Sequence, residues 1–185
     1  TKVKPTAPNV SIPVAIVLRV SATEGEIFVR PIIEQQKYYG QFSRTTDATA
    51  ASINTAYAVE FNVTEISNGI SIGTPISRLV ASGSGLYNFS ASFQLLSNSA
   101  SAKNAWLWFR KNGVDIVDSS SLVTLSGNNQ SNSVAKSELI SLAAADYVEV
   151  MYAVSDTGLF LDATAATAFA PTSPAVLISI TQVQQ

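Results

Sequence analysis

Alternating side chains between Leu86 and Leu96 constrain the fold of this chain more than any other feature of its sequence. The segment reads LYNFSASFQLL, in which apolar residues alternate with Asn, Ser and Gln. Because successive side chains of a strand point to opposite faces, this period of two predicts a half-buried β-strand. Such a face needs a second layer of strands to cover it. The buried face would consist of Tyr87, Phe89, Ala91, Phe93 and Leu95.

The segment from Ala105 to Lys111, AWLWFRK, is bulky and apolar on both of its faces. As a strand it would place Trp106 and Trp108 together on one face, with a leucine and a phenylalanine on the other. Two apolar faces suit a strand that is covered on both sides, by a second sheet and by a second subunit. The two tryptophans could stack on a sugar, but a same-face pair favours the core or a subunit interface.

Short strands separated by turn residues are predicted along the rest of the chain, at a spacing typical of β-sandwiches. No segment holds a sustained helical period, so the predicted class is all-β. A surface loop is expected over Gly127–Asn132, which is rich in Ser, Asn and Gly. After residue 37 the predicted strands cover 39–43, 58–62, 77–81, 86–96, 105–111, 114–118, 122–125, 133–142, 147–154 and 175–182.

The first 37 residues are predicted to form an extended arm and a short hairpin, ahead of a single domain over residues 38–185. Pro5 and Pro8 favour an extended arm over a helix. Strands are expected over 10–20 and 27–33, with prolines that place this hairpin at a sheet edge. No cationic leader with a cleavage site precedes the first apolar segment, so we expect a protein made in the cytoplasm that has lost its initiator Met.

The composition indicates a protein that associates with copies of itself. Charged residues make up 13% of the chain and hydrophobic residues 46%, whereas a typical soluble protein has about 25% charged residues. Oligomer interfaces are depleted in charge and enriched in aromatic residues. The composition therefore predicts a homo-oligomer, for which a dimer and a trimer both suffice. A net charge of −2 provides no basic surface for nucleic acid or anionic lipid.

The chain contains neither Cys nor His, which removes the usual zinc and copper ligands, the Ser-His-Asp triad and Cys-His pairs. Asp115 and Asp118 are three residues apart in a predicted strand and would point to opposite faces, so we interpret them as solvated carboxylates rather than a glycosidase pair. Asp156 and Asp162 flank a Gly-Leu-Phe turn but lack the dense spacing of an EF-hand. We therefore predict no catalytic residue, no cofactor and no metal site.

Five motifs in a fixed order resemble the C1q-like and tumour-necrosis-factor-like jelly rolls. They read FN, GLYNF, KNG, LAAADYV and a closing strand VLISI, against a family pattern of FN, GxYxF, KNG, LxxGDxV and a final strand. Ala145 stands where the family prefers Gly. The resemblance implies a jelly-roll β-sandwich whose motif and core residues are Phe61, Gly85, Tyr87, Phe89, Phe93, Asn112, Gly113, Asp146 and Val148.

Longer segments of the sequence are similar to C1q-like domains in structural proteins of tailed phages. These segments are YYGQF, INTAYAVEFN, WFRKNGVDI and SPAVLISITQV. That resemblance implies a homotrimer, either a capsid decoration protein or a tail-fibre head. For the subunit interface we expect Trp106, Trp108, Tyr147 and Tyr152. For an arm that docks on the major capsid protein we expect Lys2, Lys4, Pro5 and Pro8.

The first functional hypothesis is therefore a non-enzymatic decoration, or cement, protein on the capsid surface of the virion. A tail fibre carries a long shaft ahead of its head, whereas here only a short arm precedes the predicted sandwich. The alternative is a tail-fibre tip or adhesin that recognises a host glycan or surface receptor through loops such as Gly127–Asn132. A polysaccharide depolymerase is a third hypothesis, which the missing acid and base groups disfavour.

Overall fold

The computed structural model describes residues 16–20, 25–28 and 37–184, and the chain divides into two units between Gln36 and Lys37. In the first unit, β1 (Ile16–Val20) and β2 (Gly25–Phe28) form an antiparallel hairpin. The second strand begins at Gly25, two residues earlier than predicted. The expected capsid-docking residues Lys2, Lys4, Pro5 and Pro8 lie outside the described residues.

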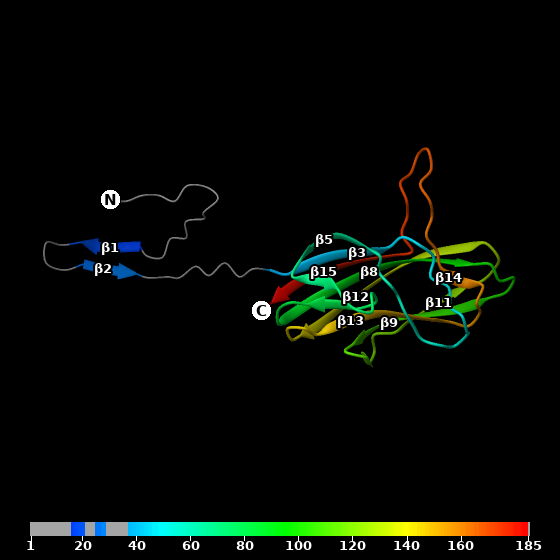
Figure 1. The fold of residues 1–185 in the computed structure, drawn as a ribbon, viewed down its shortest axis with the longest axis horizontal. Helices are drawn as coiled ribbons and strands as arrows, with labels where there is room; N and C mark the ends of the chain where they lie inside the picture. Colours follow the sequence, from blue (N-terminus) through cyan, green and yellow to red (C-terminus); the bar gives the residue numbers. More distant parts are fainter. Residues whose placement is uncertain (1–15, 21–24, 29–36, 185) are drawn as a thin grey trace. The chain divides into compact units, whose positions relative to one another are not determined.

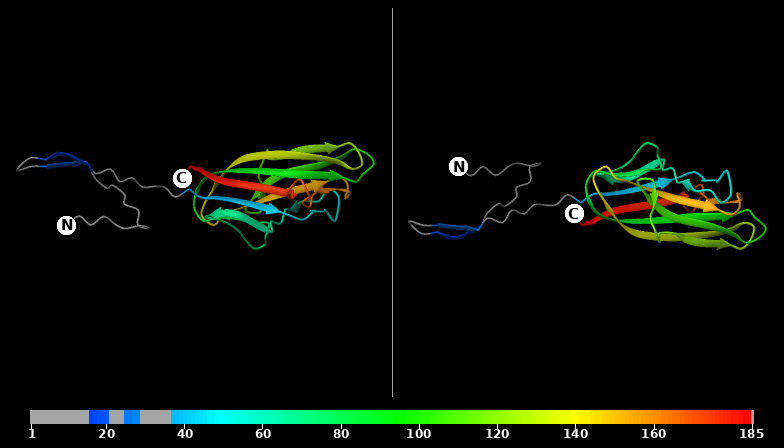
Figure 2. Two further views of the ribbon diagram at one scale, coloured as in Figure 1. Left: turned by 90° about the horizontal axis from the view of Figure 1, so that it is seen from above. Right: turned by 90° about the horizontal axis from the view of Figure 1, so that it is seen from below.

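The second unit is a sandwich of two antiparallel sheets (Figure 1). Figure 2 shows the two layers in further views, with β15 running beside β3. The β8 sheet contains, in order, β12 (Gln130–Leu142), β8 (Gly85–Ser97), β15 (Val176–Gln184), β3 (Tyr39–Arg44) and β5 (Val63–Asn68), with β14 (Leu159–Leu161) also paired to β8. The β9 sheet contains, in order, β10 (Val114–Asp115), β9 (Lys103–Lys111), β13 (Tyr147–Val154), β7 (Leu79–Ala81) and β6 (Ile70–Ile72), with β11 (Ser121–Leu125) paired to β9 and β4 (Tyr57–Ala58) paired to β13. No helix occurs among the described residues, so none there could span a membrane.

The core lies between the two sheets and follows the alternation predicted for β8. The inward residues of β8, Tyr87, Phe89, Ala91, Phe93 and Leu95, are each at most 2% exposed. They pack against the inward residues of β9 in the opposite sheet. For example, the ring centroid of Phe89 on β8 lies 6.2 Å from that of Phe109 on β9. Burial of each large apolar side chain contributes roughly 1.5–3 kcal/mol, so these two strands supply much of the stabilisation.

The motif residues occupy the core and the turns of the sandwich. Among them, Phe61 and Val148 are at most 1% exposed. Asn112 and Gly113 both have positive φ, 48° and 82°, which is the geometry of a two-residue hairpin turn. Ala145 also has a positive φ, 69°, which explains why the family pattern has a Gly at this position.

Several predicted strands differ in extent from the structure, and the strand predicted over 77–81 begins only at Leu79. The strand predicted over 114–118 ends at Asp115, because the chain turns and Asp118 adopts a φ of 62°. The strand predicted over 58–62 is reduced to Tyr57–Ala58. Conversely, β12 begins at Gln130, so half of the expected loop Gly127–Asn132 belongs to the β8 sheet. No strand was predicted for β5, β6 or β14.

Candidate functional site

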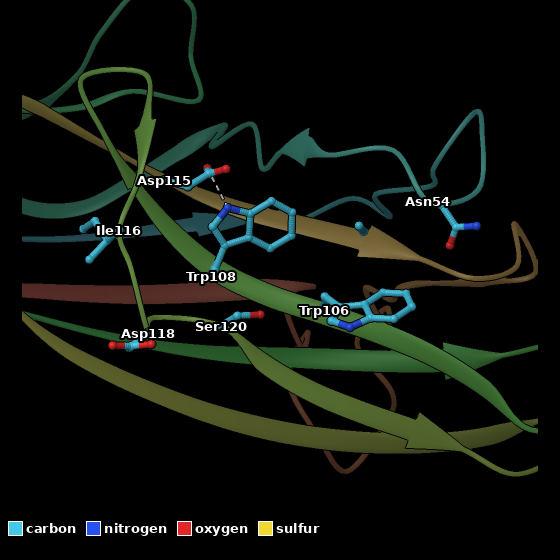
Figure 3. Close-up of a pocket in the computed structure, with 8 residues that line it drawn as sticks. Asn54, Trp106, Trp108, Asp115, Ile116, Asp118 and Ser120 are labelled. Carbon is cyan, nitrogen blue, oxygen red and sulfur yellow. Dashed lines mark hydrogen bonds between the residues drawn. The ribbon is translucent and has the colours of Figure 1, made fainter.

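A groove of about 440 Å³ lies on the outer face of the β9 sheet. Its floor is formed by Trp106 and Trp108, which are half-buried and point away from the core. Figure 3 shows both indoles on β9, with Asp115 beside Trp108 and Asn54 on the far side of Trp106. The chain between β10 and β11 supplies Asp118 and further lining residues. The tryptophan pair therefore lies outside the sandwich, and it is not part of the core between the sheets.

A hydrogen-bonded cluster fixes one end of the groove. The indole Nε1 of Trp108 donates a 2.7 Å hydrogen bond to Asp115 Oδ1, and Nε of Arg110 donates a 2.8 Å bond to the same oxygen. These bonds, chiefly the one from Arg110, lower the pKa of Asp115 from its ordinary value. Because the single polar atom of its indole is already bonded, Trp108 offers only its apolar ring surface to a ligand.

Asp115 and Asp118 line the same groove, which corrects the prediction that they point to opposite faces. The prediction assumed a continuous strand, whereas the chain leaves β10 after Asp115 and turns back at Ser119, whose N–H donates to the carbonyl of Ile116. Both side chains are exposed to solvent. The two carboxylates are hydrogen-bond acceptors at the rim of an aromatic surface.

The other two residues predicted for a subunit interface have different environments. Tyr147 is half-buried on the outer face of β13, where the guanidinium of Arg78 lies 4.3 Å from its ring centroid. Tyr152 is only 3% exposed and belongs to the core, where its ring lies 5.8 Å from that of Tyr57. Burial raises the pKa of Tyr152. Tyr152 therefore leaves little surface for contact with another subunit.

A second surface is the outer face of the β8 sheet, which sequence reasoning missed. The register places Leu139, Asn88, Thr181 and Tyr39 in one row across β12, β8, β15 and β3. Leu139 is 59% and Tyr39 40% exposed. The outward positions of these four strands carry Ser, Thr, Asn, Gln, Ala, Leu, Val and Tyr, and none is charged. In the sequence these serine-rich strands resemble ordinary solvated strands, whereas the register places their outward positions side by side. We call these positions of β12, β8, β15 and β3 the charge-free face. Its edge is marked by Glu65 of the neighbouring β5, which accepts a 2.7 Å hydrogen bond from Ser43.

The remaining acidic candidates hold loops together. Asp156 accepts hydrogen bonds from the backbone of Gly158 and from Ser99, and it forms an ion pair of 3.1 Å with Lys103. These interactions, the Gly158 bond first, lower its pKa to about 2. Asp162 accepts a 3.3 Å bond from Thr164. Within the described residues, no three His, Cys, Asp or Glu side chains gather closely enough to hold a metal ion.

No family model matches the chain, and no curated protein matches it in sequence. Solved structures do share its architecture. Two structures of murine APRIL, at pH 8.5 and pH 8.0, match with TM-scores of 0.50 and 0.52 at 9% and 10% identity, over 80% of this chain and 100% of theirs. The globular domain of zebrafish complement 1qA matches with a TM-score of 0.50 at 12% identity, over 80% of this chain and 98% of its own. The fold is a C1q/TNF-like jelly roll.

The C1q/TNF-like jelly roll was the fold that the five sequence motifs implied, and the prediction is confirmed. At these identities the likeness shows the fold alone. The C1q/TNF-like jelly roll presents two unlike outer faces: the charge-free face of the β8 sheet and, on the β9 sheet, the tryptophan groove.

Proposed function

We propose that this protein is a non-enzymatic, homotrimeric structural protein of a tailed-phage virion that decorates and stabilises the capsid. The observation that carries the proposal is the charge-free outer face of the β8 sheet. The phage assignment is supported by the sequence segments that are similar to C1q-like domains of phage structural proteins.

The β8 face is large enough to hold subunits together. β12 and β8 have 13 residues each, β15 has 9 and β3 has 6. With strand spacings of about 4.8 Å and a rise of about 3.4 Å per residue, these four strands cover roughly 670 Å². A stable protein–protein interface buries about 800 Å² on each partner. Depletion of charge and exposed residues such as Leu139 and Tyr39 suit burial in such an interface. Three copies packed about an axis would bury this face in each subunit.

The N-terminal unit supplies a separate contact to the shell. Residues 1–36 form a unit of their own, and we assign docking on the major capsid protein to this unit, including Lys2, Lys4, Pro5 and Pro8. A trimer bound to neighbouring capsomers would stabilise the shell by mass action, since it binds the assembled form. The protein would be made in the host cytoplasm and reside on the capsid surface.

The chemistry of the described residues supports a role without catalysis. The chain has no His or Cys, and Asp146 and Asp156 are both held by hydrogen bonds and ion pairs within their loops. An efficient general acid or base has a pKa close to the operating pH. The hydrogen bonds from Arg110 and Trp108 instead lower the pKa of Asp115 from its ordinary acidic value.

Location on the particle distinguishes a decoration protein from a tail-fibre tip. We expect cryo-electron microscopy of virions to show many trimeric densities across the head, and native mass spectrometry to give the mass of three chains. Emptied capsids should bind the purified protein, and a Lys2→Glu, Lys4→Glu variant should bind less than the matched Lys37→Glu control. The proposal would be overturned if the density were confined to the tail, or if the purified protein were a monomer that does not bind to emptied capsids.

A further inference from the structure

We propose that the tryptophan groove of the β9 sheet is a binding site for a neutral oligosaccharide. This inference goes beyond the capsid role, because it concerns a different face of the molecule and applies to a trimer on the head or on the tail. It rests on the aromatic floor of the groove, on the free polar groups at its rim, and on the sign of its charge.

The floor consists of two aromatic platforms set along one strand. Trp106 and Trp108 are two residues apart on β9, so their backbones are about 6.8 Å apart along the strand. A pyranose ring has an apolar face of C–H groups, which packs well on an indole that keeps its π-surface exposed. The bond from Trp108 Nε1 to Asp115 holds one platform in place, which reduces the side-chain entropy lost on binding. Two platforms in line suit consecutive sugar units of one chain.

Polar groups with unused bonding capacity surround this floor. Within the described part of the chain, Asp118 and Asn54 have no side-chain hydrogen bond or ion pair, although both line the groove. Asp115 uses only Oδ1 for Trp108 and Arg110, so Oδ2 is left to accept a further bond. Sugar hydroxyls are donors to such carboxylate and amide oxygens. An apolar floor with a few polar groups at its edge, in a cavity of 300–1,000 Å³, is typical of small-ligand sites.

The charge of the groove selects among sugars. Asp115 and Asp118 are both carboxylates, and Arg110 is already paired with Asp115 at 2.8 Å. A sialic acid, a uronic acid or a sulfated sugar would bring further negative charge beside them, which is unfavourable. Neutral hexoses and N-acetylhexosamines carry no such penalty. The chemistry therefore points to a neutral oligosaccharide.

Another copy of this chain is the competing occupant of the groove. The groove lies on the β9 sheet, whereas the charge-free face lies on the β8 sheet on the other side of the sandwich. The trimer can therefore form on one side while the groove stays open on the other. The carboxylates at the rim also suit a hydrated ligand better than a dry contact between subunits.

The intact protein carries its own probe for a binding experiment. The chain contains two tryptophans, and both lie in the groove, so intrinsic fluorescence reports directly on occupancy. The full-length protein would be titrated with maltohexaose, cellohexaose, N-acetylchitohexaose and mannohexaose, with tetragalacturonate as the acidic comparison. We expect saturable quenching or a blue shift with at least one neutral sugar and none with tetragalacturonate.

Variants locate the binding. Trp106→Ala should weaken binding about ten-fold or more, whereas Trp106→Phe should retain most of it because the platform is kept. Phe169→Ala, which changes a side chain 91% exposed on a different loop, should bind like the wild type, and native mass spectrometry should show the same assembly for all three. The proposal is overturned if no neutral sugar binds below about 10 mM, if only tetragalacturonate binds, if Trp106→Ala binds normally, or if Trp106→Ala dissociates the oligomer.

Discussion

The side-chain amide of Asn112 donates a 2.7 Å hydrogen bond to Asp146, 34 residues further along the chain. Asn112 also accepts a 2.9 Å bond from the backbone of Tyr147, and Asp146 accepts a 2.8 Å bond from the backbone of Ala143. Lys111 completes the cluster with an ion pair of 2.9 Å. Two turns at one end of the β9 sheet are thereby joined, which explains why the KNG and Asp-Tyr-Val motifs occur together.

Asp146→Asn is expected to lower the free energy of unfolding at pH 7 by about 1 kcal/mol, since it removes a charged acceptor from three hydrogen bonds. Bonds from Ala143, Asn112 and Lys111, in that order, lower the pKa of Asp146 from 3.8 to about 2. A pKa that is lower in the folded state gives stability that is present above 3.8 and is lost as the pH falls through 2. Urea unfolding from pH 7 to pH 2 should show the difference between the two proteins shrinking with acid.

Glu138→Gln is the matched control, because Glu138 has no side-chain hydrogen bond or ion pair among the described residues. Its unfolding curve should follow that of the wild type. A difference between wild type and Asp146→Asn that stays constant down to pH 2 would contradict the role given to the carboxylate.

Asp115→Asn is expected to remove one step from the acid titration of the intrinsic fluorescence. The bonds from Arg110 and Trp108 lower the pKa of Asp115, so the carboxylate protonates only below the ordinary value of 3.8. Protonation weakens the Trp108 bond and changes the environment of the indole. The step lost in the variant should have its midpoint below 3.8. A midpoint at or above that pH would mean that Asp115 is not bonded in this way.

Gly85→Ala is expected to destabilise the jelly roll by about 2 kcal/mol or more. Gly85 has a φ of 152°, and an added Cβ would overlap the backbone oxygen of Gln184. Gly127→Ala is the control, because an added Cβ there meets no atom within 4 Å. Midpoints of urea unfolding should drop for the first variant and stay near the wild-type value for the second. Equal midpoints for both would show that β15 moves freely away from Gly85.

Leu139→Asp is expected to prevent assembly of the proposed trimer, because it introduces a charge into the charge-free face of the β8 sheet. Leu139 is 59% exposed in the single subunit, so the fold itself should survive. Val117→Asp, at a position 83% exposed beside the tryptophan groove, is the control and should leave the assembly intact. Sedimentation velocity distinguishes the species. Dissociation by Val117→Asp alone would move the subunit interface to the groove side.

The central strands were predictable because the alternation of apolar and polar side chains along them indicates which face is buried. In β8 the inward positions are Tyr, Phe, Ala, Phe and Leu, while the outward positions are small and polar, so the period of two is unbroken. By contrast, most of β5 is exposed on an edge, and its side chains carry no such signal. The first residues of β12, Gln130 and Ser131, are polar and exposed, and backbone pairing with β8 alone makes them strand.

The groove could be foreseen only in part. The sequence indicated that Trp106 and Trp108 share a face, but whether a second layer covers that face depends on how the sheets stack. Asp118 lines the groove because the chain turns after β10, where Asp118 itself adopts a left-handed backbone conformation. A strand pattern in the sequence does not reveal such a turn. The charge-free face depends on the registers in which β12 and β15 pair with β8, and both of these strands are distant from β8 in the sequence.

The first and last strands of the jelly roll run antiparallel side by side, with Tyr39 opposite Thr181 and Arg44 opposite Val176. The backbone thus enters and leaves the jelly roll at one end, whereas the hairpin that closes between Thr167 and Ala170 projects from the side of the sandwich, past its middle (Figure 1). A foreign peptide grafted into that hairpin would project from the jelly roll, away from the two strand ends by which the chain enters and leaves it. The hairpin is therefore a suitable insertion point for peptide display, because it is separate from the two strands that carry the ends of the jelly roll.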